Sequence, residues 1–211
     1  MKLWNRVTRV KPETLSEASA ALIDTHEYIN SVSDYNYALW ETVIGTLGEF
    51  GVSALCPDIE SFYSGSLIHP EMDAETMQKK AATVNMCVDS LPEDSLWNII
   101  HTVGDWSNVP NIVANVINTI HVEQIAGNLE STIEFVDYMH QLSGTPATVS
   151  TSFWGTGPAI RLIWGYESLT DFDERTTKGM IDTGFHERNA KNAERFGAPV
   201  QTQSNVMKRL V

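Results

Sequence analysis

A repeated Leu-Trp-Asn tripeptide constrains this chain most, because it opens two segments of strand character that lie 93 residues apart. The two segments are residues 3–10 and 96–103, and both are rich in Trp, Val, Ile and Thr, as β-strands are. Self-similarity at a long, fixed spacing indicates that one supersecondary unit occurs twice. We therefore expect a duplicated unit.

Each of these segments precedes a run of apolar residues at helical spacing, over residues 15–32 in the first copy and residues 122–139 in the second. Thr14 and Glu17 have the spacing of a capping box at the start of the first helix. Gly144 predicts the end of the second helix, because glycine commonly follows the last helical residue.

Two strand-like runs separated by glycine follow each helix, which is a hairpin signal, and another helix follows each hairpin. The runs are residues 37–44 and 50–55 in the first copy, and residues 148–154 and 159–166, around Gly155-Thr156-Gly157, in the second. The following helices begin near residues 57–62 and 170–174, the last helix ends at Phe196-Gly197, and a final strand is predicted over residues 200–210.

This order predicts an α+β fold made of two ferredoxin-like βαββαβ repeats. One such repeat leaves one face of its sheet uncovered, so we expect the two repeats to pack sheet-to-sheet as an α/β barrel. The polar stretch around Pro92 divides the chain into residues 1–92 and 93–211. Helical spacing of Ile112, Val116 and Ile120 predicts an inserted helix near residues 108–120 of the second repeat.

The composition argues against several classes of partner. A net charge of −13 disfavours nucleic-acid binding, which depends on clustered Lys and Arg. No apolar run approaches the ~20 residues of a membrane span, and the N-terminus has no signal-peptide pattern. Cys56 and Cys87 have no metal-binding spacing, and the six histidines form no metal motif. We expect a cytoplasmic protein without nucleic-acid or membrane partners.

Residues 161–176, RLIWGYESLTDFDERT, resemble the strand-to-helix signature of NIPSNAP-like proteins, which belong to the dimeric α/β barrel superfamily. The glycine turn before this segment is similar to that of the family, whereas residues 52–62 match only loosely. The resemblance implies the barrel fold and little about activity. We expect a ligand, if there is one, to be a small molecule held between the sheets. It does not fix a cofactor, although haem occurs in some relatives, and a homodimer is compatible with it.

Relatives in this superfamily use an Asn on the first strand, together with a Trp and sometimes a His. Together with the residue patterns given next, the resemblance suggests Asn98, Trp164 and Tyr166 as catalytic candidates, and Asn5, Trp40, Arg161 and His186 as ligand-binding candidates. Trp164 and Tyr166 are two residues apart on a strand and so share one face. Arg161 is a charge among apolar neighbours, which points to solvent, a pocket or a carboxylate. For all of these residues, a purely structural role is the alternative.

Three functions are compatible with these features. The first is an enzyme with monooxygenase-like or isomerase-like activity on an apolar or aromatic molecule. The second is a binding protein that holds such a molecule without transforming it. The third is a protein-interaction scaffold with the same barrel. A buried polar group close to Trp and Tyr side chains would favour the first two functions.

Overall fold

The computed structural model describes residues 1–65, 73–152 and 157–211, which contain both strands and helices in an α+β fold. The strands are β1 (Lys2–Arg9), β2 (Ala38–Ile44), β3 (Glu49–Cys56), β4 (Glu93–Val103), β5 (Ile112–Thr119), β6 (Ala147–Ser152), β7 (Ala159–Tyr166) and β8 (Gln201–Arg209). The helices are α1 (Leu15–Val32), α2 (Ile59–Gly65), α3 (Ala74–Cys87), α4 (Ile125–Ser143), α5 (Leu169–Ile181) and α6 (Thr183–Phe196), with short 3₁₀ turns at Pro12–Thr14 and Val122–Gln124.

The strands hydrogen-bond in the order β1-β3-β2-β8-β5-β7-β6-β4 and close into a barrel, which confirms the predicted fold class. The chain divides into two compact units. The first unit contains residues 1–97 and 207–211, and the second contains residues 98–206. Strands β4 and β8 each run from one unit into the other, so the first unit consists of two stretches of sequence and the second of one.

Strand register is the same in the two units at a shift of 110 residues. Asn5 lies opposite Ser53 in the first unit, and Asn115 lies opposite Ile163 in the second. The β2–β3 and β6–β7 ladders repeat with the same shift, and so do the first residues of α1 and α4. The strand equivalent to β1 is therefore β5, and the Leu-Trp-Asn match to residues 96–98 is wrong as a structural equivalence, because those residues lie in β4.

The inserted helix expected near residues 108–120 is also wrong, because residues 112–119 form strand β5. Its apolar positions fit a helical period, but its Val and Ile residues are β-branched and favour strands. Every residue of β5 pairs with β7, and this pairing overrides the local period. Residues 112–119 are therefore not an insertion, because they form the strand of the second unit that is equivalent to β1.

The sequence correctly predicts where two helices end, but the predicted capping box of α1 does not form. Gly144 and Gly197 both follow a helix with positive φ, as expected for glycine at a C-terminus. Thr14 does occupy the N-cap of α1, but its hydroxyl donates to the Lys11 carbonyl because a 3₁₀ turn precedes the helix. Residues 155 and 156 of the expected glycine turn lie outside the described residues.

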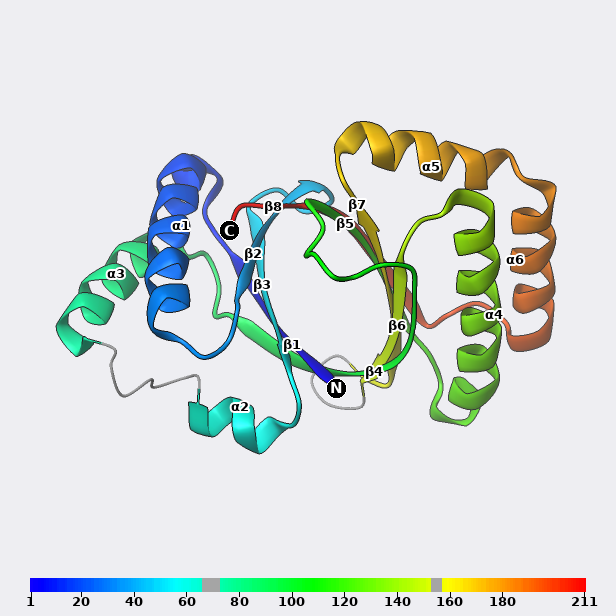
Figure 1. The fold of residues 1–211 in the computed structure, drawn as a ribbon, viewed down its shortest axis with the longest axis horizontal. Coiled ribbons are helices and arrows are strands. Elements are labelled where there is room, and N and C mark those ends of the chain that lie inside the picture. Colours follow the sequence, from blue (N-terminus) through cyan, green and yellow to red (C-terminus); the bar gives the residue numbers. More distant parts are fainter. Residues whose placement is uncertain (66–72, 153–156) are drawn as a thin grey trace. The chain divides into compact units, whose positions relative to one another are not determined.

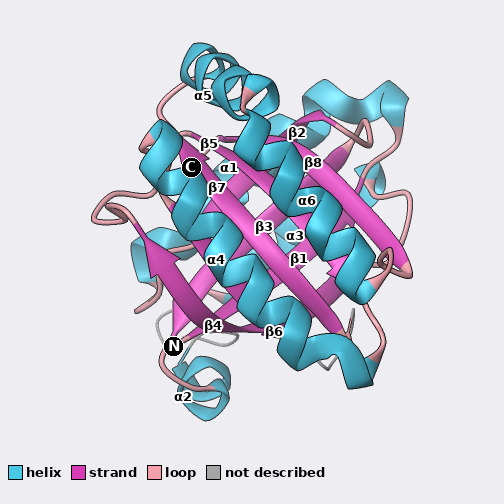
Figure 2. Cartoon of the chain, turned by 90° about the vertical axis from the view of Figure 1, so that its right-hand side faces the viewer, coloured by secondary structure: helices cyan, strands magenta, loops and turns pink. Residues whose placement is uncertain are grey.

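One face of the sheet in each unit is covered by helices. In the first unit α1 and α3 lie side by side (Figure 1), and Ala18 and Leu22 of α1 pack against Trp4 and Val52. In the second unit α4 crosses in front of β7 (Figure 2), and its Val136 packs with side chains of β6 and β7. Because strand side chains alternate, this packing defines which residues face the helices and which face away from them.

The structure also shows where the two cysteines lie and whether a helix could span a membrane. Cys56 pairs with Lys2 at the start of β1, whereas the Cys87 carbonyl accepts from the Lys11 amide, beyond the other end of β1. The nine residue steps from Lys2 to Lys11 span about 30 Å, so the two thiols cannot form a disulfide, and both are free. Among the described residues, no helix has the length and apolarity needed to cross a membrane.

Candidate functional site

The helix-facing side of the sheet in the first unit holds a charged and aromatic cluster. Trp4 packs among apolar residues of α1, which places the even-numbered residues of β1 on this face. Arg6 is the next residue along this face, and its guanidinium carbon lies 5.2 Å from the centroid of the Trp4 ring. This distance is within the range of a cation–π interaction.

Asp94 of β4 fixes the orientation of Arg6. The Arg6 Nε and Nη2 atoms donate to the two carboxylate oxygens of Asp94 at 2.7 and 2.8 Å, in a fork-like pair. Hydrogen bonding to Asp94 raises the pKa of Arg6, so the guanidinium stays charged at every physiological pH. The pair is partly exposed, with 38% of the Arg6 side chain and 40% of the Asp94 side chain accessible.

Tyr37 adds a second aromatic ring to the cluster. Its ring meets that of Trp4 edge-on, with centroids 6.1 Å apart and planes at 88°. Asn30, near the end of α1, holds the Tyr37 backbone on both sides, because its side chain donates to the Tyr37 carbonyl at 2.9 Å and accepts from the Tyr37 amide at 2.8 Å. Tyr63 of α2 lies close enough to Arg6 to raise the pKa of the guanidinium slightly, as Tyr37 does.

His26 contributes the ionisable group from the helix side. It lies one turn after Leu22 on the buried face of α1, and its side chain is only 8% exposed. Its Nδ1 lies 2.8 Å from the Leu22 carbonyl oxygen. Burial lowers the pKa of His26, and the charge on Arg6 lowers this pKa further. The imidazole is therefore neutral at pH 7.

These four side chains place a fixed cation, two aromatic rings and a neutral imidazole on one face of one unit. We call Trp4, Arg6, His26 and Tyr37 the α1-side cluster. Aromatic rings supply apolar contact area and prefer flat partners, and the guanidinium attracts an anionic or electron-rich oxygen. This combination is suited to a planar aromatic molecule that carries a hydroxyl or carbonyl group.

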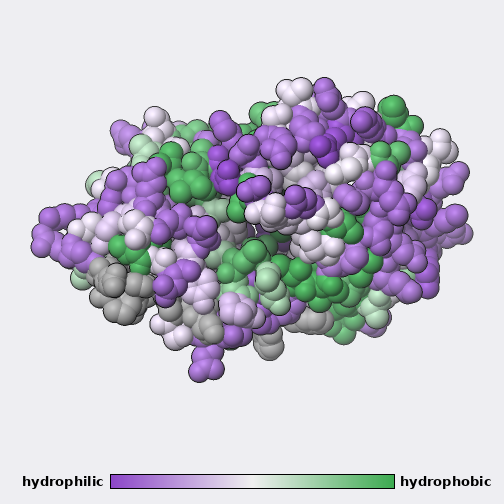
Figure 3. Space-filling view, in the orientation of Figure 1, coloured by the Kyte–Doolittle hydropathy of each residue, from purple (hydrophilic) through white to green (hydrophobic). Residues whose placement is uncertain are grey.

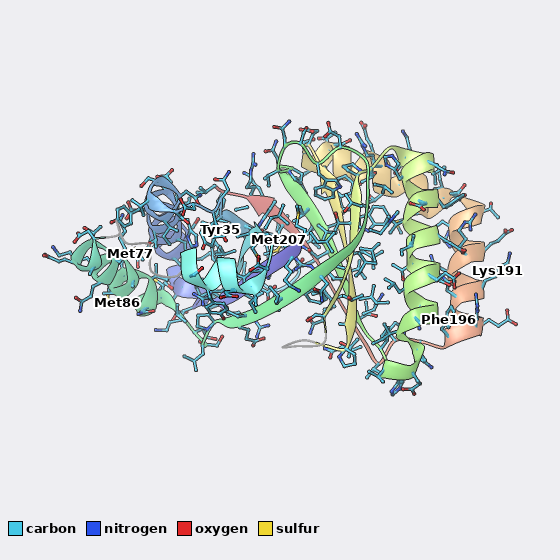
Figure 4. All side chains as sticks on the ribbon, turned by 60° about the horizontal axis from the view of Figure 1, so that its bottom comes forward. Tyr35, Met77, Met86, Lys191, Phe196 and Met207 are labelled. Atoms are coloured by element: carbon cyan, nitrogen blue, oxygen red, sulfur yellow. The ribbon has the colours of Figure 1, made fainter. Side chains whose placement is uncertain are left out.

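Two predicted ligand-binding residues lie on the opposite face of the same sheet. Asn5 is buried and lies opposite Ser53, on the side away from α1. The Trp40 indole nitrogen donates to the Ser53 hydroxyl at 2.9 Å. Gly51, beside Trp40, faces the side chain of Met207, which is labelled in Figure 4. Asn5 and Trp40 therefore share a face, but they do not share it with the α1-side cluster.

Trp164 and Tyr166 share a strand face, as their spacing predicts, and this face is the one that packs on helices. The Trp164 ring meets Phe135 of α4 edge-on at 6.4 Å, and the Tyr166 ring meets Phe172 of α5 at 5.2 Å. Tyr166 is 5% exposed, and its burial raises the pKa of the phenol far above its ordinary value. These contacts are those of a packed core.

Arg161 lies on the other face of β7, away from α4, and is buried. Its Nε and Nη2 atoms donate to Asn115 Oδ1 at 3.2 and 2.7 Å, and Asn115 Nδ2 donates to Asn205 Oδ1 at 3.0 Å. Burial lowers the pKa of Arg161 to about 10, which still leaves it charged at neutral pH. The three side chains form a buried polar network among β5, β7 and β8 of the second unit.

Asn98 lies apart from Trp164 and Tyr166. It pairs with Thr151, which in turn pairs with Ile160, four residues before Trp164 on β7. Four residues of strand span about 13 Å. A register shift between Ile99 and His101 also puts Asn98 on the same face as His101, whereas simple alternation predicts opposite faces.

His186, a ligand-binding candidate, lies on α6, whose exposed surface is largely hydrophilic (Figure 3). Its Nε2 lies 2.7 Å from the Met180 carbonyl, so this nitrogen carries a proton and cannot ligate iron as it stands. The surroundings of His186 therefore do not fit an axial haem ligand. Among the residues that the structure describes, no group of three or more His, Cys, Asp or Glu side chains could hold a metal ion.

The sequence interpretation missed Arg6 and His26 as site residues. Helical spacing placed His26 on the buried face of its helix, which is correct, but that position alone favours a core histidine. One available signal was the position of Arg6 two residues after Trp4 on a strand, where side chains share a face. Only the packing of β1 on α1 brings the two residues into one layer.

No protein family profile matches this sequence, and no curated protein matches it significantly. The likeness of residues 161–176 to NIPSNAP-like proteins is therefore still a prediction. Comparison with solved structures, in contrast, finds similar folds over the whole length of the chain. The fold that they share is a ferredoxin-fold α+β barrel.

Two of these structures have a TM-score of 0.70. A candidate monooxygenase from Fusobacterium nucleatum is 10% identical, and the match covers 100% of this chain and 92% of that one. An anthrone oxidase-like protein is also 10% identical, with 100% and 91% covered. A ferredoxin-fold protein from Listeria monocytogenes, related to antibiotic biosynthesis monooxygenases, has a TM-score of 0.52 and 8% identity, with 100% and 95% covered. At such identities the likeness concerns the fold alone.

Proposed function

We propose that the α1-side cluster binds a planar aromatic small molecule with an acidic hydroxyl or carbonyl group, and that the chain oxidises it in a monooxygenase-like reaction. The observation that carries the proposal is Arg6, held by Asp94 over the Trp4 ring in a layer that also contains a neutral imidazole. In the second unit, the positions equivalent to Trp4 and Arg6 are Ala114 and Val116. The proposed site therefore belongs to the first unit.

The names of the structural neighbours support an oxidation of this kind, since one is anthrone oxidase-like and another is a candidate monooxygenase. Such a reaction balances with O₂ as the only other reactant. The substrate loses two hydrogen atoms from one carbon and gains one oxygen atom there, and the second oxygen atom leaves as water. Arg6 would stabilise the negative charge that develops when the substrate loses its first proton.

Anthrone provides a direct test. We expect the protein to accelerate O₂ uptake by anthrone and the formation of anthraquinone, measured with an oxygen electrode and by chromatography. Arg6→Met should lower kcat/KM by about 100-fold, the usual cost of removing one donor to a developing oxyanion. Arg175→Met is the matched control, because Arg175 pairs with Asp171 within α5 of the second unit.

The result separates the proposed function from its alternatives. Equal activity of the wild type and the Arg6→Met variant would contradict the assignment of the site. Tight binding of anthrone without O₂ uptake would instead identify a ligand-binding protein with the same site. If anthrone neither binds nor reacts, and other aromatic phenols behave in the same way, the cluster is not a site for this class of molecule.

A further inference from the structure

We propose that His26 is the proton acceptor of this site, and that its Nε2 takes the acidic proton of an aromatic substrate whose charge then faces Arg6. The inference rests on the proposed function and deepens it, because it limits the substrates to aromatic molecules with a proton acidic enough for an imidazole. Phenols and the ring-activated CH₂ groups of anthrone-type ketones belong to this class.

The hydrogen bond of Nδ1 determines which nitrogen can accept a proton. Nδ1 lies 2.8 Å from the Leu22 carbonyl oxygen, which can only accept a hydrogen bond, so Nδ1 carries the hydrogen. In a neutral imidazole the other nitrogen, Nε2, then holds the lone pair. Because Nδ1 is turned back toward the backbone of α1, Nε2 is the ring nitrogen on the side away from that carbonyl.

The surroundings of His26 keep this lone pair free of a proton in the resting state. Burial lowers the pKa of His26, and the nearby Arg6 charge acts in the same direction. The hydrogen bond to Leu22 opposes these effects without reversing them. Once a substrate gives up its proton, the new negative charge lies near both Arg6 and the imidazolium, which stabilises the charge-separated state.

The second unit shows that the fold does not require a histidine here. With α1 and α4 aligned at the shift of 110 residues, His26 corresponds to Val136, which is fully buried. Arg6 corresponds to Val116 at the same shift. The imidazole and the guanidinium thus occur together in one unit and are both replaced by valine in the other. A pair that occurs together in this way fits a joint chemical role.

The proposed step is a simple proton transfer. An O–H or C–H bond of the substrate breaks, an N–H bond forms at His26 Nε2, and the electron pair remains on the substrate next to Arg6. The resulting anion is the electron-rich species that reacts with O₂ in the oxidation described above. The proton returns to a product oxygen atom or to solvent, so that the imidazole is neutral again after each turnover.

Binding of p-nitrophenol tests this step without any oxidation, because the phenolate absorbs visible light and the phenol does not. At a pH below the pKa of free p-nitrophenol, we expect wild-type protein to increase the phenolate absorbance at least several-fold. His26→Leu should still bind the probe, measured by calorimetry, but should give a clearly smaller increase, because only Arg6 then favours the phenolate. His140→Leu is the matched control, because His140 Nδ1 makes the same kind of bond, to the Thr145 carbonyl at 2.9 Å.

The possible outcomes distinguish the inference from the proposed function. If the probe binds and the His26→Leu variant ionises it as the wild type does, the role of His26 is wrong and the site itself stands. If the probe does not bind to the wild type, the proposed aromatic site fails, and the role of His26 fails with it. If His26→Leu does not fold, as judged by circular dichroism, His26→Gln replaces it, since a neutral amide cannot accept the proton.

Discussion

At positions 110 residues apart, the first unit has Arg6 and His26 where the second unit has Val116 and Val136. The helix-facing layer of the first unit therefore holds a guanidinium and an imidazole beside its apolar core, whereas both equivalent positions are apolar in the second unit. Strand register and helix start are nevertheless the same in both units. Two units with the same strand register can therefore differ in the chemistry of one layer through a few substitutions.

On the sheet faces turned away from the helices, the charged residue is in the second unit. Where the first unit pairs Trp40 with Gly51, the second pairs Ser150 with Arg161. Each pair combines one large and one small side chain, so both fill a similar space, but only the second pair introduces a buried charge. This face carries a buried Asn in both units, Asn5 and Asn115, but only the second unit adds a buried charge to it. This arrangement predicts that ligand chemistry and stability depend on different arginines.

Arg161→Ala should have the largest effect on stability. It leaves a cavity and removes the donors to the Asn115 oxygen, which together should lower the free energy of unfolding by about 3 kcal/mol. Arg6→Ala should cost less than about 1 kcal/mol, because its ion pair with Asp94 is partly exposed. Urea denaturation of both variants measures the difference. A larger loss for Arg6→Ala would reverse the proposed division of roles.

Trp4→Leu and Trp164→Leu should separate binding from packing. Each loses aromatic contact area and should destabilise its unit by about 2 kcal/mol. Only Trp4→Leu should weaken the binding of p-nitrophenol, by about tenfold, because only Trp4 lies beside Arg6. Calorimetric titration of the two folded variants provides the comparison. Weakened binding in Trp164→Leu alone would move the site to the second unit.

The replacement His26→Val, which copies the second unit at this position, should change how stability depends on pH. The pKa of His26 is lowered by burial and by Arg6, so near pH 6.5 and below the unfolded chain binds a proton that the native protein resists. Native stability is complete above this range and falls as the pH decreases toward the folded pKa. Melting temperatures at pH 7 and pH 5 should therefore differ less for His26→Val than for the wild type.

Tyr166→Phe should have the smallest effect. Its ring packs on Phe172, and Phe preserves this contact, so stability should change by no more than about 0.5 kcal/mol. Binding of p-nitrophenol should be unchanged. A loss of binding in this variant, with the melting temperature preserved, would support the catalytic role that the sequence predicts for Tyr166.

Local patterns predicted most of the fold. Period-2 and period-3.6 segments placed all four strands and the first helix of residues 1–97 near their actual positions, and glycine marked the ends of α4 and α6. The pattern failed at β5, where Ile112, Val116 and Ile120 also fit a helix. Periodicity cannot separate a short apolar strand from a helix, so only the pairing of β5 with β7 decides between them.

The candidate site could be predicted only in part, because a site depends on which sheet face a residue occupies. Spacing shows that Trp164 and Tyr166 share a face, but it does not show that this face packs on α4 and α5. Likewise, Asn98 and His101 share a face only because the register shifts between them. Arg6 and His26 lie 20 residues apart on different elements, and no local pattern relates them.

The first unit includes residues 207–211 at the C-terminal end of the chain, and this has a consequence for synthesis on the ribosome. The Leu39 amide donates to the Val211 carbonyl, and the Leu210 amide donates to the Leu39 carbonyl, so the final residues pair directly with β2. At typical translation rates, these residues emerge on the order of ten seconds after the rest of the unit. The α1-side cluster therefore lies in a unit that cannot complete its sheet until residues 207–211 have been synthesised, and a chain that lacks them would expose the edge of β2 to other nascent chains.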